Sequence, residues 1–479
     1  MSSTPGVYIK EVDGLSLSVK SGATAVPVFV GNFEATSAQA KQQKCMPISG
    51  WLEFATHYKT VAEVDVLTLE AADLAALDSG NAKGLTELKR KITVQPNWGA
   101  LTLQHYFQNG GGACYVMPLG SHGDPALWKT EPAMLPAEIE KHPAITLLVC
   151  AEPEQEGALD KGQKGEVYAK LVTALTNPKS PGRYFLIGDA EQDTGGETVK
   201  VEVPEALKSE KHAAVYYPAL KTTLRHVRKD DDELVVAFDV KVDDAEKQYT
   251  VGKDSNKAIN RLSLLAKANA KGKQARYQAL SRLIDATLAE QVVELPPSAA
   301  MAGVYASTDR GRGVWKAPAN VALNAVTEPT TRVTDDVQGG LNEKGINVIR
   351  RFMSGGTVVW GARTQAKEKE WLYVPVRRLF TAAERDIRDA LQVAVFEPNS
   401  APTWTTVKTA LDAYLTRLWR QGALAGNKAE EAFFVQVGRG ITMDDDDIQN
   451  GRLIVKVGMA AVRPAEFIIL QFTQNVAQG

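Results

Sequence analysis

The sequence predicts an α/β protein with several domains, and three observations lead to that prediction. Apolar runs of strand length alternate with helical segments in the first half of the chain. This alternation is typical of a mainly parallel sheet that is covered by helices. The length of 479 residues corresponds to roughly three domains of ordinary size. Both ends of the chain are also rich in strand-forming residues.

The first half of the chain supplies the alternating elements. A strand is expected at 6–12, after Pro5, and another at 25–31. Ser49 is the expected N-cap of a short helix at 48–58. The remaining predictions in this half are helices at 69–77, 101–108 and 166–175, and strands at 114–117, 145–149, 183–187 and 213–217.

Composition and charge restrict the expected partners and the cellular location of the protein. The formal net charge of −2 gives no global reason to expect nucleic acid or an anionic membrane as a partner. The first residues lack the basic and apolar regions of a signal peptide. No apolar run approaches the roughly 18 residues that span a bilayer. Cys45, Cys114 and Cys150 form no CxxC pair, which predicts reduced, buried thiols in a cytosolic protein.

Residues 221–294 differ from the rest of the chain in the distribution of charged residues and in the predicted secondary structure. Runs at 224–228 and 234–240 flank Lys229 and three aspartates, which predicts a hairpin with a polar turn. The stretch 256–293 is expected to be helical, with a break at Gly272. Acidic residues gather first and basic residues follow. This basic run is either a surface for nucleic acid or an acidic neighbour, or a solvated helix face beside the acidic hairpin.

The clearest helix in the sequence is expected at 403–421, between Pro402 and Gly422. At 3.6 residues per turn its apolar residues form one stripe, while Arg417 and Arg420 fall on the far side. This helix is therefore expected to be buried on one face only. The stripe consists of Trp404, Val407, Leu411, Tyr414, Leu415 and Leu418.

Other elements of the C-terminal part carry weaker signals. A helix is expected at 381–395, where Thr381 and Glu384 have the spacing of a capping box. Residues 341–345 are expected to form a turn, and 357–360 a strand. Trp315 and the segment 360–364 are expected to serve a hydrophobic core and not a ligand site.

The last stretch of the chain contains two β-branched runs, 453–457 and 467–473. Pro464 lies between them and breaks the strand, because it cannot donate to a β-ladder. A terminal strand must pair with something, and the strand at 6–12 raises the same question at the other end. Two readings remain open: the ends add strands to neighbouring copies, or they pair inside their own subunit.

A search for catalytic chemistry finds no built site. The six histidines form no HxxxH or HExxH pattern, and the glycine clusters match neither a P-loop nor GxGxxG. The segment 353–356 resembles a nucleophile elbow but lacks its leading glycine. The aspartates 444–447 lack the spacing of a calcium loop, so capping of a turn is favoured. No catalytic, cofactor-binding or metal-binding residue is predicted.

Many short pieces, in a fixed order along the chain, match one known family. In the C-terminal half these pieces are 297–306, Asp309, 312–320, 341–342, 345–347, 359–364, 396–399, 422–424, 432–435 and 463–467. Earlier matching pieces are 5–8, 107–116 and 213–218. Through these pieces the chain resembles the tail sheath proteins of contractile phages and of phage-like contractile injection particles. The resemblance covers roughly 1–60, 97–220 and 295–479, and it departs at 221–294, which looks like an insertion.

The resemblance implies a domain organisation. Residues 1–30 are expected to form an N-terminal arm with the first strands, which pack with the C-terminal domain, and residues 31–220 an outer α/β domain. Residues 221–294 are expected to be a variable, outward-facing charged insertion, and residues 295–479 a sheath domain that ends in a strand-forming arm.

The resemblance also implies an assembly. Subunits are expected to stack as hexameric rings in a helical homo-oligomer around an inner tube protein. Baseplate and terminal cap proteins are the other expected partners, with no nucleic acid and no membrane insertion. Contraction is expected to be a switch between two packings of the same chain, with no cofactor. The particle, a phage tail or a released tail-like device, is expected to assemble in the bacterial cytoplasm.

Two sets of residues follow from this resemblance. Strand exchange between subunits is expected at Val7, Tyr8, Ile9, Phe467, Ile468, Ile469, Leu470 and Phe472. Contact with acidic groups of the inner tube is expected at Lys408, Arg417 and Arg420 on the helix at 403–421. The competing interpretation is that these three are solvated surface charges. Two other functions also stay open: a sheath-like adaptor or terminal ring protein, and an enzyme with an unrecognised site.

Overall fold

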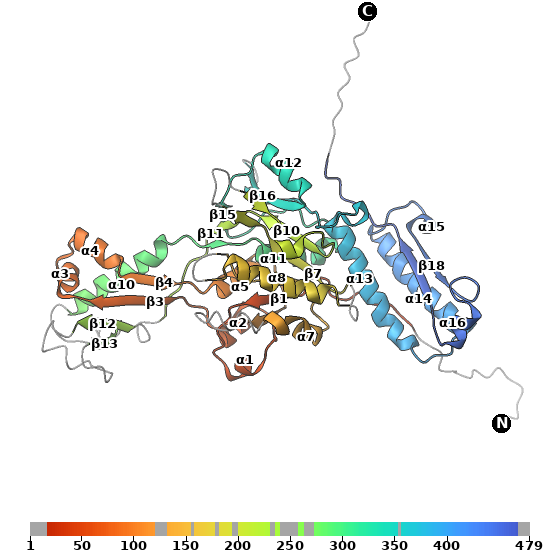
Figure 1. Cartoon of the computed structure of the whole chain (residues 1–479), viewed down its shortest axis with the longest axis horizontal. Coiled ribbons are helices and arrows are strands. Elements are labelled where there is room, and N and C mark those ends of the chain that lie inside the picture. Colours follow the sequence, from red (N-terminus) through yellow and green to blue (C-terminus); the bar gives the residue numbers. More distant parts are fainter. Residues whose placement is uncertain are drawn as a thin grey trace, which may run out of the picture. The chain divides into compact units, whose positions relative to one another are not determined.

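The computed structural model describes residues 17–119, 132–154, 158–177, 182–193, 200–229, 235–239, 257–262, 273–352 and 356–467. The chain divides into two compact units (Figure 1). In the described residues, one unit contains 17–24, 308–317 and 368–467, and the other contains the rest of 25–367. Each unit is built from segments that are distant in sequence.

The larger unit is organised around an eight-stranded sheet, which confirms the predicted α/β class. The five inner pairings are parallel, and the outer pairs β17–β16 and β5–β2 are antiparallel. In spatial order the strands are β17 (Gly356–Trp360), β16 (Ile346–Phe352), β10 (Ala213–Tyr217), β7 (Phe185–Asp189), β6 (Leu147–Cys150), β1 (Pro27–Gly31), β5 (Cys114–Pro118) and β2 (Met46–Ile48).

Helices cover both faces of this sheet, because its inner strands are apolar on both sides. On one face, α8 (Lys161–Leu175) and α7 (Leu135–Glu140) join a buried core that includes Leu148 and Leu186. On the other face, α5 (Trp98–Gln108) places Tyr106 against Phe29, with ring centroids 4.9 Å apart. Smaller elements of this unit are α1 (Ala38–Gln42), α2 (Trp51–His57), α12 (Asp335–Glu343), β8 (Glu191–Asp193), β9 (Lys200–Glu202), β11 (Leu220–Thr222), β14 (Glu294–Leu295) and β15 (Val326–Pro329). The long helix α11 (Ser298–Arg312) follows β14.

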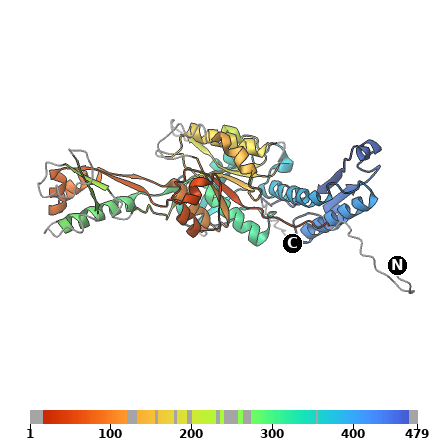
Figure 2. The same ribbon diagram turned by 90° about the horizontal axis from the view of Figure 1, so that it is seen from below.

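A second sheet joins two segments that are far apart in the chain. Its strands, in order, are β13 (Lys257–Arg261), β12 (Val235–Asp239), β3 (Glu63–Leu69) and β4 (Ile92–Gln95). The helices α3 (Ala71–Ser79), α4 (Ala82–Lys89) and α10 (Lys273–Glu290) share its core. Arg276 holds Asp78 with two hydrogen bonds of 2.7 and 2.6 Å, which tie α10 to α3. Figures 1 and 2 both show these elements grouped apart from the eight-stranded sheet.

This second sheet corrects two predictions for residues 221–294. The expected hairpin between 224–228 and 234–240 is wrong, because β12 pairs with β13 and, in parallel, with β3. The expected helix over 256–293 is wrong in its first part, where 257–261 is a strand, and right in its second part. The strand 257–261, Lys-Ala-Ile-Asn-Arg, has no apolar alternation of its own, and the lysines and alanines around it favour a helix.

The smaller unit contains a helical pair and a β-hairpin. Helices α13 (Val374–Leu391) and α14 (Ala401–Arg420) pack with the hairpin β18 (Phe433–Val437) and β19 (Val455–Met459) around one core. The short helices α15 (Ala429–Ala432) and α16 (Asp445–Gln449) lie in the connections. Five of the six residues of the predicted stripe on α14 are buried, and Trp404 is partly exposed.

Three helix boundaries differ from those predicted. The helix expected from Thr381 begins at Val374, with Pro375 in its first turn, so the capping box is wrong; Glu384 accepts a hydrogen bond from Arg377 instead. Residues 341–343 end α12, and only Lys344 and Gly345 form the turn. The N-cap of α2 is Gly50, not Ser49.

Two predicted roles of other side chains have different outcomes. Trp315 packs against the core of the smaller unit, as expected, whereas Trp360 is 42% exposed, so its predicted core role is wrong. The aspartates before β19 cap α16 through Asp444, whose carboxylate accepts from the Asp447 N–H at 2.7 Å. That outcome matches the favoured capping role.

A buried carboxyl group predicts a pH dependence of stability. Glu152, directly after β6, is fully buried; its Oε1 accepts from the Asn32 N–H at 2.6 Å, and its Oε2 has no partner among the described residues. Burial raises the pKa of Glu152 to about 7. Because the pKa is higher in the folded chain than in the unfolded chain, this group stabilises the fold below about pH 4.5 and loses that contribution as pH rises through about 7.

In the wild type, the free energy of unfolding is expected to fall as the pH rises from about 4.5 to 7. Glu152→Gln is expected to abolish this fall, because glutamine does not ionise. A shift of this size corresponds to on the order of 3 kcal/mol. Urea unfolding at a series of pH values measures the effect, with the exposed Glu343→Gln on α12 as the matched control. Parallel pH profiles for the wild type and Glu152→Gln would contradict the prediction.

Candidate assembly surfaces

The segment 17–24 is held against the helical pair of the smaller unit by contacts with its backbone. Val19 is 3% exposed and belongs to the core, and its carbonyl oxygen accepts from Arg417 Nη2 at 2.9 Å. The Gly22 N–H donates to Asp386 Oδ1 at 3.1 Å. The Thr24 carbonyl accepts from Arg378 Nη2 at 3.0 Å. We call residues 17–24 the N-terminal anchor, because these contacts hold the first described residues of the chain.

A buried carboxylate organises the middle of this anchor. Asp386 accepts from Gly22, from Arg385 Nη2 at 3.3 Å and from the Tyr414 hydroxyl at 2.9 Å. Burial, and then the Asp386 charge, raises the pKa of Tyr414, so this hydroxyl remains a proton donor. A Cβ atom on Gly22 would lie 3.0 Å from Arg385 Nη2, so a larger residue at this position would require that side chain to shift.

A second buried pair closes the anchor at Thr24. Arg378 and Asp309 have side chains that are 3% and 6% exposed, and they form two hydrogen bonds of 3.0 and 2.6 Å. Asp309 Oδ2 also accepts from the Thr24 hydroxyl at 2.5 Å. Contacts that join residues more than 280 positions apart leave no local pattern. In the sequence, Asp309 stands out only through the family resemblance, and no sequence signal identifies Asp386.

The β18–β19 hairpin is the second surface. Its register runs from Phe433 opposite Met459 to Val437 opposite Val455, and its inner face packs on the core. Among the described residues no third strand pairs with either edge of this two-stranded sheet. Two-stranded sheets with free edges expose unpaired backbone groups that can accept a further strand. The hairpin therefore has the form of a strand acceptor.

The predicted strand-exchange residues lie mostly outside the described residues. These are Val7, Tyr8, Ile9, Ile468, Ile469, Leu470 and Phe472. Phe467 is described and is 72% exposed. The preceding residue, Glu466, accepts from the Tyr373 hydroxyl at 3.1 Å. The described residues nearest both ends, 17–24 and Glu466, are therefore held by contacts within the smaller unit.

The three predicted tube-contact residues are all exposed on α14, but the helix does not bring them together. Lys408 pairs with Asp412 at 2.5 Å. Arg417 binds the Val19 carbonyl and lies 5.3 Å from the Tyr414 ring centroid. Arg420 has no ion-pair partner among the described residues. Lys408 and Arg417 are about two and a half turns apart, and so lie on opposite sides of the helix.

Other chemistry is sparse in the described part of the chain. There, no group of three or more His, Cys, Asp or Glu side chains is placed to hold a metal ion. Cys45, Cys114 and Cys150 are free and buried, as predicted, and burial raises the pKa of the Cys45 thiol to about 12. None of the described helices combines the length and the apolar character that a membrane crossing requires.

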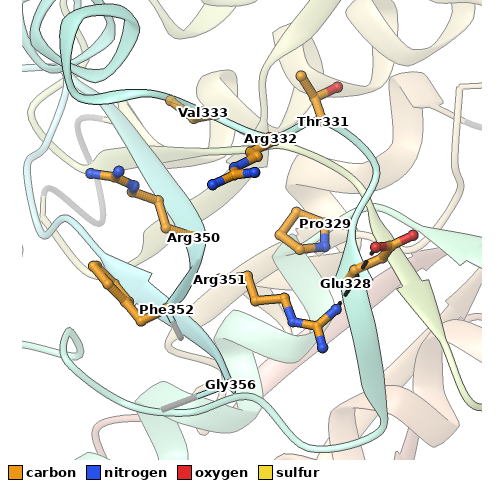
Figure 3. Close-up of a pocket in the computed structure, with 9 residues that line it drawn as sticks. All are labelled: Glu328, Pro329, Thr331, Arg332, Val333, Arg350, Arg351, Phe352 and Gly356. Atoms are coloured by element: carbon orange, nitrogen blue, oxygen red, sulfur yellow. Dashed lines mark ion pairs between the residues drawn. The ribbon is translucent and has the colours of Figure 1, made fainter. Parts of the chain in front are cut away.

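One pocket in the larger unit gathers three arginines (Figure 3). We call it the arginine pocket; it measures about 540 Å³ and is lined by Glu328, Pro329, Thr331, Arg332, Val333, Arg350, Arg351, Phe352 and Gly356. Arg350 donates to Asp335 at 2.6 Å, and Arg351 lies 3.8 Å from Glu328. Arg332 is exposed and has no ion-pair partner in the described residues. The pocket therefore has positive charge beside an aromatic ring.

Comparison with known proteins agrees with the resemblance seen in the sequence. Residues 252–365 match the phage tail sheath protein central domain, and residues 366–475 match the phage tail sheath C-terminal domain. A tail sheath protein of Vibrio phage KVP40 is 29% identical over 135 residues, which are 27% of this chain and 20% of that protein. The chain thus spans about a fifth of the length of this curated relative.

Solved structures match over nearly the whole chain. A chain of the anti-feeding prophage helical sheath in the contracted state is 38% identical, with a TM-score of 0.66 over 99% of this chain and 100% of that one. A chain of the PVC sheath complex, from an extracellular contractile injection system in the contracted state, is 34% identical, with a TM-score of 0.62 and 99% of both chains covered. This chain belongs to the contractile tail sheath protein family.

Proposed function

We propose that this chain polymerises as stacked hexameric rings around an inner tube and contracts to drive that tube through a target envelope. The observation that carries the proposal is the β18–β19 hairpin, whose edges have no partner strand among the described residues. The terminal arms of neighbouring copies would complete this sheet by β-augmentation. A head-to-tail contact of this kind generates a helical assembly.

The arms would pair through the residues predicted for exchange. Val7, Tyr8 and Ile9 would supply the N-terminal strand, and Phe467 with the apolar residues after it the C-terminal strand. Backbone hydrogen bonds would hold the strands while the bodies of the subunits rotate. The N-terminal anchor supports this role, because buried contacts hold the arm at its root. Contraction would then be a switch between two packings of one chain.

The wider setting follows from the same proposal. The sheath would assemble in a bacterial cytoplasm, as part of a phage tail or a released tail-like particle, on a baseplate and under a terminal cap. The chain would act as a structural subunit without catalysis. Residues 1–30 would form the arm and first strands, 31–220 an outer domain, 221–294 a variable insertion and 295–479 the domain that carries the assembly surfaces.

Negative-stain microscopy of the protein expressed alone tests this function. Long hollow tubules would support a sheath. Discrete rings would instead support the second candidate, a sheath-like adaptor or terminal ring protein. A protein that stays monomeric at high concentration would contradict both the sheath and the ring protein, and would favour an enzyme.

Contact with the tube is proposed for Lys408, Arg417 and Arg420 on α14. Arg420→Glu is the cleanest test, because Arg417 also holds the anchor and Lys408 is already paired with Asp412. An exposed ion pair contributes up to about 1 kcal/mol, so reversing the charge is expected to weaken co-assembly with the tube about tenfold. Co-sedimentation with purified tube measures this effect.

The control for this prediction is Lys428→Glu, which reverses a charge at another exposed position of the same unit. Tubules of sheath alone are expected to form normally with both variants. Equal co-sedimentation of Arg420→Glu and wild type would remove Arg420 from the tube surface.

A further inference from the structure

The corner between α13 and α14 exposes an apolar patch that has no use inside the chain. Val393 is 57% exposed, Val395 59% and Phe396 102%. We call residues 393–397 the Phe396 corner. Single exposed apolar residues are common on protein surfaces, but here a fully exposed phenylalanine directly follows an exposed valine, and a second exposed valine lies two residues earlier.

The backbone of this corner is strained by the same residue. Val395 has φ −69° and ψ 131°, Phe396 has φ +73°, and the Glu397 N–H donates to the Ala394 carbonyl at 3.3 Å. These values fit a type II turn, whose second central position favours glycine. A bulky side chain is rarely found at positive φ, because its Cβ atom then crowds the neighbouring backbone. Phe396 therefore combines an unfavourable backbone conformation with a fully exposed side chain.

The segment that follows the corner is held by hydrogen bonds. Asn399, two residues after Glu397, accepts from Trp404 Nε1 at 2.7 Å, and its Nδ2 donates to the Arg452 carbonyl at 3.1 Å. These bonds tie Asn399 to the start of α14 and to the segment that leads into β19. An aromatic side chain has few rotatable bonds and offers a large contact area, so Phe396 is suited to be the centre of an interface.

The corner has a complementary surface in the arginine pocket. Phe396 is followed by Glu397, an exposed carboxylate with no ion-pair partner among the described residues. In the pocket, Phe352 and Pro329 stand on opposite sides of the opening with arginine side chains around it (Figure 3). An aromatic ring next to a carboxylate thus matches an aromatic wall next to guanidinium groups.

We propose that the Phe396 corner of one copy of this chain docks into the arginine pocket of a second copy. Phe396 packs between Phe352 and Pro329, and Glu397 pairs with Arg332, the guanidinium of the pocket that has no ion-pair partner in the described residues. The two surfaces are different, so the contact is heterologous and repeats from copy to copy. The inference rests on the proposed function, because it places this contact in the sheath lattice.

Photo-crosslinking tests the contact directly. Phe396 is replaced by p-benzoylphenylalanine in tubules that mix isotopically heavy and light copies. Peptides from 326–333 or 346–352 are expected to be joined to the corner, with one heavy and one light partner. The same replacement at Leu52, which is 82% exposed on α2, serves as the control. Crosslinks only within one chain, or to other segments, would overturn the proposal.

A charge exchange tests the ion pair. Glu397→Arg and Arg332→Glu are each expected to raise the protein concentration needed for tubules about tenfold, because each places like charges together. The double variant is expected to return to within about threefold of the wild type, since the pair is restored in reverse. A double variant that assembles worse than either single variant would overturn the pairing.

The change Phe396→Gly separates docking from a structural role. It relieves the positive-φ strain and removes an exposed ring, so the isolated subunit is expected to unfold at a higher urea concentration than the wild type. Tubule formation is nevertheless expected to fall at least tenfold. Wild-type protein that forms no tubules would overturn the proposed function, whereas normal tubules from Phe396→Gly would overturn this inference alone.

Discussion

Deletion of residues 1–16 is expected to abolish tubules while leaving the subunit folded. The deletion stops at residue 16 because Val19 is part of the core and the anchor begins at residue 17. A strand of about five backbone hydrogen bonds, each contributing about 1 kcal/mol, amounts to roughly 5 kcal/mol per contact. That loss corresponds to more than a thousandfold in the concentration required for assembly.

Sedimentation and negative-stain microscopy measure assembly, and circular dichroism checks that the subunit is folded. A finer version of the test places proline in the expected strand. Tyr8→Pro removes a backbone donor and is expected to block tubules, whereas Ser3→Pro, outside the strand, is expected to be harmless. Intact tubules from the deleted protein would rule out exchange through the N-terminal arm.

Asp309→Leu is expected to destabilise the smaller unit strongly. It removes both hydrogen bonds to Arg378 and leaves that guanidinium, 3% exposed, without its buried counter-charge. Breaking a buried pair by removing one partner costs about 3–5 kcal/mol. Urea unfolding followed by circular dichroism gives the change in the free energy of unfolding.

The matched control removes both charges at once. Asp309→Leu with Arg378→Met is expected to recover most of the lost stability, because no uncompensated charge remains in the core. The exposed pair of Lys408 and Asp412 provides a second comparison, where Asp412→Leu is expected to cost under about 1 kcal/mol. A similar cost for Asp309→Leu and Asp412→Leu would show that the buried pair contributes little.

The elements that the sequence predicted well are those with a strong local pattern. The amphipathic stripe of α14 identified its buried face, and the apolar runs identified most strands of the eight-stranded sheet. The predictions failed where local pattern was weak. The strand at 257–261 is short and rich in charge, and its pairing with β12 decides its structure.

The second sheet accounts for the two segments that the family resemblance does not cover. The resemblance skips both 61–96 and 221–294, and only the latter was interpreted as an insertion. The structure joins them, because β12 pairs with β3 and α10 shares a core with α3 and α4. The two skipped segments therefore form one folded element, in which Arg276 of α10 binds Asp78 of α3.

By itself, the sequence determined the α/β class, the buried face of α14 and the family, because each depends on residues that are neighbours along the chain. Only the tertiary structure decided which residues meet across long separations. It placed Asp386 beneath Gly22, joined β12 to β3 and put Phe396 in a strained, exposed turn. The physical reason is that side-chain periodicity reports which face of an element is buried, whereas the identity of the partner depends on packing of the whole chain.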